Sequence, residues 1–267
     1  MRTLHELMSL EGRVCLITGG AGHIGMAMAE SLAEMGAKLI LVDFDEQSLT
    51  QAKLHILNLF GQEPTSLVAD LANEDQRMAV PEFVQSTYGR LDVLINNAAF
   101  TGDTAIAGWA TSFEKQTIDA WRSALEVNLT AAFHLSQLLS PMLKQHGQGV
   151  IANIGSIYGL LGPDLRLYEG TDMASPAAYA ASKGGLVQLT RWLATVLAPE
   201  IRVNCISPGG VFRNQPSQFV KRYEIKTPLQ KMATEEDLKG AIAYLASDMS
   251  AYVTGHNLMV DGGWTAW

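Results

Sequence analysis

Short apolar runs alternate with longer amphipathic stretches along almost the whole chain, and this alternation restricts the fold more than any other feature. The runs are rich in aliphatic and β-branched residues, as buried strands are, and they span residues 13–18, 38–43, 65–69, 91–96, 149–155, 201–206 and 257–260. Stretches of helical period lie between them, near residues 24–36, 46–60, 74–88, 115–145, 176–198 and 234–247. This rhythm predicts an α/β fold with a parallel seven-stranded sheet and helices on both of its faces.

The length of the chain suits one domain of this kind. It has 267 residues, of which 48% are hydrophobic and 17% charged, so a large core can form. We therefore expect residues 1–267 to be a single domain. Two long connections interrupt the rhythm, at about residues 156–178 and 207–233. Because both follow predicted strands, at the sheet edge where such folds bind ligands, we expect them to be the substrate loops.

Composition and charge exclude several classes of function. The formal net charge of -8 argues against a general nucleic-acid binder. No apolar run approaches the roughly 20 residues of a membrane span, and residues 1–13 lack the apolar stretch of a signal peptide. Cys15 and Cys205 lie inside apolar runs and are expected to be core thiols, and the histidines show no metal-ligand spacing. We expect a cytoplasmic protein without metal, nucleic acid or membrane partners, acting on a small-molecule substrate.

A glycine-rich stretch, TGGAGHIG at residues 18–25, connects the first predicted strand to the first long helix. In that context Gly19, Gly22 and Gly25 allow backbone N–H groups at the helix N-terminus to face a pyrophosphate. Asp43 closes the second strand. Its carboxylate can accept hydrogen bonds from the adenosine ribose hydroxyls and would repel a 2′-phosphate, so the sequence predicts NAD in preference to NADP.

The segment YAASK places Tyr179 and Lys183 four residues apart on a predicted helix, hence on one face. An isolated phenol has a pKa near 10, and a nearby ammonium stabilises the phenolate and lowers that pKa. We therefore expect Tyr179 to act as general base on a substrate hydroxyl at neutral pH, and as acid in reverse. Ser156 ends the fifth strand, where its hydroxyl can hydrogen-bond the substrate oxygen.

Taken in order, these pieces resemble the short-chain dehydrogenase/reductase family over essentially the whole chain. The matching motifs are TGGAGHIG, VDFD, VADL, NNAA, the Asn of EVNLT, NIGSIYG, YAASK, RVNCISPGG and VTGHNLMVDGG. The resemblance implies a doubly wound Rossmann fold and hydride transfer between a nicotinamide cofactor and a secondary alcohol or ketone. It also implies a homotetramer or homodimer, assembled through the two long helices near 115–145 and 176–198 and through the C-terminal strand.

The resemblance also implies a role for individual residues. It assigns catalysis to Asn128, Ser156, Tyr179 and Lys183, with Asn128 binding a water in a proton relay and Lys183 also holding the nicotinamide ribose. It assigns cofactor binding to Gly19, Gly22, His23, Ile24, Gly25, Asp43, Asp70, Leu71, Asn97, Ala98, Tyr179, Lys183, Pro208, Gly209 and Val211. The chain departs from the family pattern at Arg213, where a threonine is frequent, and at Ala99, where a glycine is common.

The glycine spacing itself is unusual for the compact branch of the family, whose middle glycine stands at the position of His23. The GxxGxxG spacing resembles the extended branch, but extended members need a larger C-terminal substrate domain, for which this sequence leaves no room. We therefore predict a compact member in which Gly22 supplies the backbone freedom needed near the pyrophosphate. His23 is expected to point at solvent or to pack beside the phosphates, without a catalytic role.

The segment LLGPDLRLYEGTDM, residues 160–173, makes the connection after Ser156 longer than is usual in the compact branch. We expect this segment to lie over the substrate, and the predicted substrate contacts are Ser156, Tyr158, Arg166, Tyr168 and Arg213. Arginine suits phosphate and carboxylate groups, so these residues predict a polar, carbohydrate-like or sugar-phosphate substrate. The combination faintly resembles bacterial members of the family that act in surface and flagellar sugar biosynthesis.

Two other functions stay open. A 3-oxoacyl-thioester reductase is common on this fold, although such enzymes usually prefer NADP and Asp43 argues against that cofactor. A non-catalytic dinucleotide-binding regulatory protein is the other alternative. Such proteins typically lose one of the four catalytic residues, and all four are present here.

Overall fold

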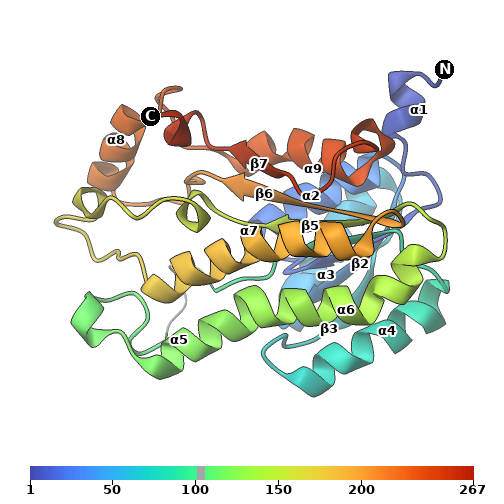
Figure 1. The fold of residues 1–267 in the computed structure, drawn as a ribbon, viewed down its shortest axis with the longest axis horizontal. Coiled ribbons are helices and arrows are strands. Elements are labelled where there is room, and N and C mark those ends of the chain that lie inside the picture. Colours follow the sequence, from blue (N-terminus) through green and yellow to red (C-terminus); the bar gives the residue numbers. More distant parts are fainter. Residues whose placement is uncertain (101–105) are drawn as a thin grey trace.

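A computed structural model describes residues 1–100 and 106–267 of the chain (Figure 1). Its strands form one parallel sheet in the order β3-β2-β1-β4-β5-β6-β7. They are β1 (Val14–Thr18), β2 (Lys38–Asp43), β3 (Thr65–Val68), β4 (Val93–Asn96), β5 (Gly149–Ile154), β6 (Ile201–Pro208) and β7 (Asn257–Val260). Each strand predicted from an apolar run is confirmed.

Helices cover both faces of this sheet. On one face lie α2 (His23–Glu34), α3 (Glu46–Phe60) and α9 (Lys239–Ala246), whose buried side chains form a core with the strands. On the other face lie α4 (Glu74–Tyr88), α6 (Ala131–Lys144) and α7 (Ala177–Leu197), with a second core beneath them. The strand order and the two helical layers are those of a doubly wound Rossmann fold, as the sequence predicted.

The sequence explains where these elements begin and end. Every residue of β1 is buried, which is why its apolar run shows no alternation. Helix α3 starts after Asp45, whose side chain accepts a hydrogen bond from the N–H of Gln47, and stops at Gly61 in the left-handed conformation. Helix α4 starts after Asn73 and stops at Gly89 in the same way. Polar caps and glycine stops therefore fix the connections at the edge of the sheet.

The helical predictions need three corrections. The stretch predicted as one helix over 115–145 consists of α5 (Ile118–Leu125), a π-helical turn (Glu126–Thr130) and α6. A short N-terminal helix, α1 (Leu4–Met8), was not predicted. Nor was α8 (Ser217–Lys226), which lies within the connection expected to be a loop over 207–233. In α8 only Phe219 and Tyr223 are buried, so the segment carries too few apolar positions to show a helical period.

Short 3-10 turns complete the chain, at Phe113–Lys115, Ile157–Gly159, Leu165–Leu167, Glu235–Leu238, Asp248–Ser250 and Trp264–Ala266. Both cysteines are buried and free, as expected for core thiols. Across residues 1–100 and 106–267, no helix is both long enough and apolar enough to cross a membrane.

A third apolar cluster lies beyond the sheet edge, where α8 approaches the C-terminal turn (Figure 1). In it Trp264 stacks on Tyr223 with ring centroids 4.3 Å apart, and Phe219 follows at 6.1 Å from Tyr223. Tyr168, from the segment 160–173, packs on Phe219 at 5.4 Å. We call these four rings the aromatic column. It joins the C-terminal turn, α8 and the segment 160–173 into one packed unit beside the sheet.

Candidate active site

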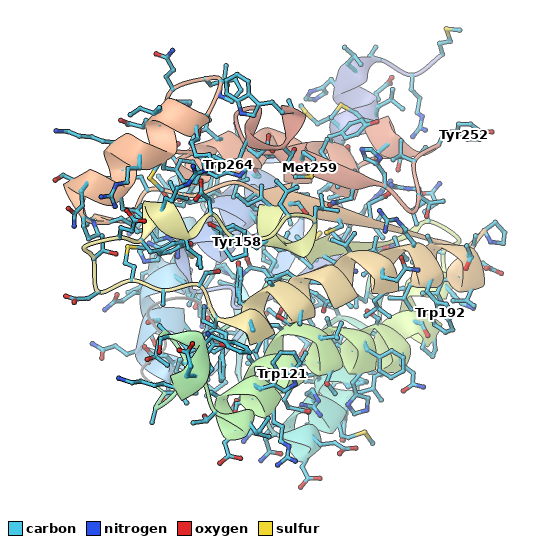
Figure 2. The ribbon with its side chains drawn as sticks, turned by 60° about the vertical axis from the view of Figure 1, so that its left-hand side comes forward. Trp121, Tyr158, Trp192, Tyr252, Met259 and Trp264 are labelled. Carbon is cyan, nitrogen blue, oxygen red and sulfur yellow. The ribbon has the colours of Figure 1, made fainter. Side chains whose placement is uncertain are left out.

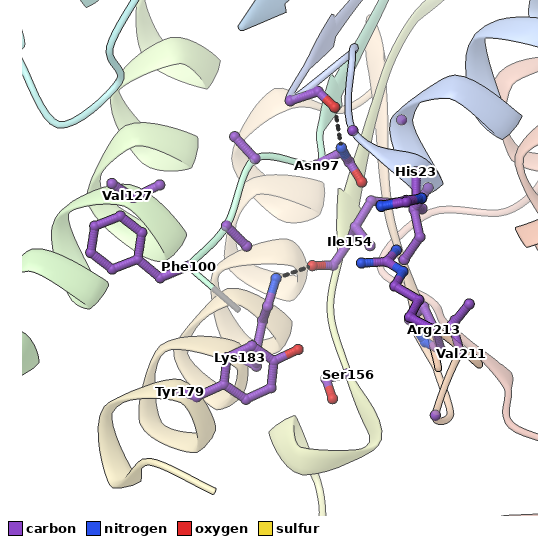
Figure 3. A pocket seen from close by; sticks show the side chains of 18 of the residues that line it. His23, Asn97, Phe100, Val127, Ile154, Ser156, Tyr179, Lys183, Val211 and Arg213 are labelled. Atoms are coloured by element: carbon purple, nitrogen blue, oxygen red, sulfur yellow. Dashed lines mark hydrogen bonds between the residues drawn. The ribbon is translucent and has the colours of Figure 1, made fainter. Parts of the chain in front are cut away.

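The carboxyl ends of the central strands open onto a cavity of about 730 Å³ (Figure 3). The residues expected to bind a dinucleotide come together there. All of them line the cavity: Gly19, Gly22, His23, Ile24, Gly25, Asp43, Asp70, Leu71, Asn97, Ala98, Tyr179, Lys183, Pro208, Gly209 and Val211. Ser156 also lines it, so that the predicted base and its hydroxyl partner face the same space.

The glycine loop is packed too tightly to accept side chains at two of its positions. A Cβ atom on Gly25 would lie 2.1 Å from the carbonyl oxygen of Gly19, and Gly19 itself has a φ of +61°. The Nδ2 of Asn97 donates to the carbonyl oxygens of Thr18 and Gly19, each at 3.0 Å (Figure 3). Asn97 therefore fixes the shape of the loop with its side chain as well as lining the cavity.

Gly22 does not have the role predicted for it. Its φ of -77° and ψ of 165° are extended backbone that any residue adopts, so the required freedom lies at Gly19 instead. Gly22 is the N-cap of α2 and offers no side chain to cap the helix. The N–H groups of the first turn therefore stay available to an anion in the cavity. The side chain of His23, the first residue of α2, is 71% exposed, as expected.

The adenosine end of the cavity carries Asp43 at the end of β2. Its carboxylate accepts hydrogen bonds from the backbone N–H groups of Ala21, at 3.2 Å, and Phe44, at 2.9 Å. This end of the cavity fits a dinucleotide. The glycine loop and the uncapped start of α2 would receive the pyrophosphate, and the fixed carboxylate of Asp43 would receive a ribose.

The structure corrects the expected pKa of Tyr179. Burial raises the pKa of this phenol above its usual value, and a hydrogen bond with Ser156 and the charge of Arg213 only partly oppose that effect. Lys183 lies on the same face of α7, with its Nζ 5.8 Å from the centre of the Tyr179 ring. The prediction of a lowered pKa was therefore wrong, because the phenol and the ammonium expected to stabilise its phenolate are both buried.

Lys183 is buried, and its ammonium donates a hydrogen bond to the carbonyl oxygen of Ile154 at 2.6 Å (Figure 3). Burial lowers the pKa of Lys183 to about 8. Near neutral pH this group therefore still carries a proton, and a modest change in its surroundings can remove it. Such a group can supply positive charge beside Tyr179 or pass on a proton.

Asn128 sits behind the cavity, in the π-helical turn before α6. Its Oδ1 accepts a hydrogen bond from the N–H of Phe100 at 2.7 Å, and its Nδ2 donates to Ser182 Oγ at 3.0 Å. The side chain thus joins the segment after β4 to α7. Both the oxygen and the nitrogen of the Asn128 carboxamide thus already have hydrogen-bond partners. A relay water held by this residue would therefore bind its main-chain carbonyl oxygen.

The predicted substrate residues separate into two groups. Tyr158 and Tyr168 line the cavity, and their hydroxyl groups share a hydrogen bond of 2.9 Å. Arg166 is outside the cavity lining, with a side chain that is 78% exposed and bonded to Asp164, so its assignment to the substrate was wrong. Its charge serves the folding of its own loop, whose 3-10 turn Asp164 caps.

Several aromatic side chains of the cavity were not predicted. Phe100 and Trp109 line the side next to α5, and Phe219 and Tyr223 of α8 line the opposite end. Phe100 directly follows the NNAA motif and could have been found by that position. No sequence pattern indicated the other three aromatic residues, because they reach the cavity only through the tertiary packing of the long connections.

Comparisons with known proteins agree over nearly the whole chain. The profile of a family described as Enoyl-(Acyl carrier protein) reductase matches residues 19–265. The 3-oxoacyl-[acyl-carrier-protein] reductase of Thermotoga maritima is 32% identical, over 96% of this chain and 99% of its own. The post-translational flagellin modification protein A of Campylobacter coli is 30% identical over 96% and 99%. The "Probable galactose dehydrogenase" of Rhizobium meliloti is 32% identical over 97% of each.

Solved structures show the same architecture. A short-chain dehydrogenase of Leptospira borgpetersenii with bound NAD+ superposes with a TM-score of 0.84 at 36% identity, over 99% of this chain and 96% of that one. The NADPH-dependent 3-quinuclidinone reductase of Rhodotorula rubra superposes with a TM-score of 0.88 at 27% identity, over 100% and 96%. The similar proteins thus include users of either cofactor.

Proposed function

Because the chain belongs to the short-chain dehydrogenase/reductase family, whose members interconvert alcohols and ketones with NAD(P), we propose that it is an NAD-linked dehydrogenase with Tyr179 as its acid and base. The observation that carries this proposal is the convergence of Ser156, Tyr179 and Lys183 on one cavity beside the glycine loop. All four residues of the catalytic set are present, which argues against a non-catalytic binding protein.

We propose a task for each of these groups. The bound nicotinamide supplies the hydride acceptor or donor. The hydroxyls of Ser156 and Tyr179, which both line the cavity, would hold the substrate oxygen between them. Tyr179 gives its proton to the oxygen of a ketone or takes one from an alcohol. Lys183, fixed by the carbonyl of Ile154, provides the adjacent positive charge and the route by which the proton reaches Asn128 and solvent.

The preference for NAD rests on Asp43. Its carboxylate faces the cavity at the end of β2 and is held by two backbone N–H groups, so it cannot easily turn away from the ligand. A 2′-phosphate placed there would meet a fixed negative charge at short range. The ribose hydroxyls of NAD would instead donate to the same oxygens.

The lining of the substrate end supports an uncharged, hydroxylated substrate. Phe100, Trp109 and Phe219 provide flat apolar surfaces, and Tyr158 and Tyr168 provide hydroxyl groups. Of the two arginines expected to face the substrate, Arg166 points away from the cavity, and Arg213 is paired with Glu235. A carbohydrate-like ring fits such a lining better than a sugar phosphate does, because the ring can stack on aromatic faces and hydrogen-bond the phenols.

A second candidate is reduction of 3-oxoacyl thioesters, which is the activity in the name of the Thermotoga relative. The two candidates can be separated by following NADH in the presence of uncharged sugars and cyclic polyols, sugar phosphates, or hydroxyacyl thioesters. We expect turnover on an uncharged polyol. Turnover on thioesters alone would favour the second candidate. Binding of NADH without turnover on any class would favour a non-catalytic role.

A further inference from the structure

The side chain of Arg213 follows the end of β6 and lines the cavity, yet it is directed to the cofactor half rather than the substrate half. Figure 3 shows it next to His23, with Ser156 and Tyr179 lower in the view. Its Nε donates to Glu235 Oε1 at 3.3 Å, and the Nδ1 of His23 lies 4.0 Å from the same oxygen. Arg213 is therefore held at the first residue of α2.

Glu235 occupies an unusual position for a carboxylate. It lies in the 3-10 turn Glu235–Leu238, which packs on α2 near the helix start whose N–H groups have no side-chain cap. An anion at this place interacts favourably with the partial positive charge of the helix start and with Arg213. This is the chemistry that a pyrophosphate in the glycine loop would require. The Glu235 carboxylate, which does not line the cavity, engages Arg213 beside that loop.

We propose that Arg213 binds the pyrophosphate of the cofactor, exchanging the Glu235 carboxylate for a phosphate oxygen when the dinucleotide enters. The inference rests on the dinucleotide site of the proposed function and moves Arg213 from the substrate, where the sequence placed it, to the cofactor. The guanidinium is 26% exposed at the cavity wall, so it can change partners without unfolding the loop. Its fork can bond two phosphate oxygens at once, which a threonine at this position could not do.

The test uses ADP-ribose, which carries the pyrophosphate but neither the nicotinamide nor a substrate, and measures its Kd by calorimetry. For Arg213→Ala we expect the Kd to rise at least about tenfold, because a charge-assisted hydrogen bond is lost. The Kd of Arg213→Lys should lie between those of the wild type and Arg213→Ala, since lysine keeps the charge but cannot bond two phosphate oxygens at once as the guanidinium can. Glu235→Gln should bind at least as tightly as the wild type, because the competing carboxylate is removed.

The matched control is Lys231→Ala. Lys231 pairs with Asp237 on the same turn as Glu235 but lies outside the main cavity, so its loss removes one charge from the region without removing a ligand group. We expect an unchanged Kd for this variant. Circular dichroism of each variant shows whether the fold is kept, and Arg213→Lys provides the test if Arg213→Ala does not fold.

Three results would overturn the proposal in different ways. If Arg213→Ala and Arg213→Lys bind ADP-ribose as the wild type does, while the KM of an anionic ketone rises, Arg213 is a substrate residue. If the wild type binds neither ADP-ribose nor NADH, the dinucleotide site and the proposed function both fail. An equal loss in Lys231→Ala would show a general charge effect and would also contradict the proposal.

Discussion

At Tyr179 two opposing effects act on one phenol. Burial raises its pKa, whereas the hydrogen bond with Ser156 and the charge of Arg213 lower it, and burial prevails. The free protein therefore holds Tyr179 in its protonated form at neutral pH, which suits the donation of a proton to a ketone. Oxidation of an alcohol needs the phenolate, and the positive charge of the oxidised nicotinamide would favour that form.

This balance predicts different pH profiles for the two directions. Because the raised pKa keeps the proton on Tyr179, kcat/KM for alcohol oxidation should rise from about pH 7 to about pH 10 as the phenolate becomes more populated, whereas kcat/KM for ketone reduction should stay level over that range because the proton donor remains protonated. Initial rates in both directions, with Tyr179→Phe as the blank, measure this. Oxidation that is independent of pH near neutrality would show that the phenolate is already formed.

The carboxylate of Asp43 predicts a change of cofactor preference. Asp43→Asn should raise the ratio of kcat/KM for NADP to that for NAD by about tenfold or more, since the charge that repels the 2′-phosphate is removed. The control is Asp45→Asn, which removes a neighbouring charge that also lines the cavity but keeps the N-cap of α3. A similar shift in both variants would indicate general electrostatics instead of a contact at Asp43.

At the scale of elements, the segments that could be identified most easily from the sequence are those whose side chains are buried throughout. The strands β1, β4 and β5 are buried at every position, so their composition alone identified them. The glycine loop, Asp43 and Ser156 follow or end strands, so the strand positions alone bring them to the same cavity. The charged segment 160–173 was misread, because Arg166 and Lys226 both pair with Asp164 and so fold the loop instead of facing a ligand.

The helix α8 illustrates what the sequence could not show. Its polar side chains bond the neighbouring segment: Arg222 Nη1 donates to the carbonyl oxygen of Glu169 at 2.5 Å, and Gln218 donates to that of Gly170. The buried face of α8 packs against Trp264, which is distant in the sequence and stacks on Tyr223. Pairings of this kind depend on the tertiary fold, and local periodicity does not encode them.

The aromatic column predicts that the C-terminal turn supports the substrate pocket. Trp264→Ala should lower the free energy of unfolding by about 3–5 kcal/mol, as for other buried aromatic truncations, and should raise the KM of the alcohol by loosening Phe219 and Tyr168. Trp267→Ala is the control, because that side chain is 81% exposed and makes one hydrogen bond, to Lys226. Thermal unfolding measures the loss of stability, and steady-state kinetics measure the KM. If both variants lost stability and substrate affinity equally, the aromatic column would not be what supports the substrate pocket.

At the scale of the whole molecule, large apolar side chains are exposed on each helix of the α5–α7 layer. Trp192 on α7 is 54% exposed, and Phe133 on α6 is also exposed. Figure 2 shows Trp192 together with the exposed Trp121 of α5. Large apolar groups gathered on neighbouring helices are typical of subunit interfaces. We therefore expect a homotetramer or homodimer that uses this layer.

Light scattering checks that assembly directly. The wild type should give a mass that is a multiple of the 28.9 kDa chain, and Trp192→Glu should shift it towards the monomer, because a charge would be buried at the interface. Leu54→Glu alters an equally exposed apolar residue on α3, across the sheet, and should leave the mass unchanged. A monomeric wild type at micromolar concentration would contradict the expected assembly.

The most direct test of the central claim compares Tyr179→Phe with the wild type on the best substrate of the panel. We expect turnover to fall at least about a hundredfold, since the proton donor and acceptor is lost, while the Kd for NADH stays within about twofold. Tyr88→Phe is the matched control, because it removes a phenol that hydrogen-bonds Thr65 away from the cavity. If Tyr179→Phe kept its turnover, the acid–base role of Tyr179 and the mechanism built on it would be wrong.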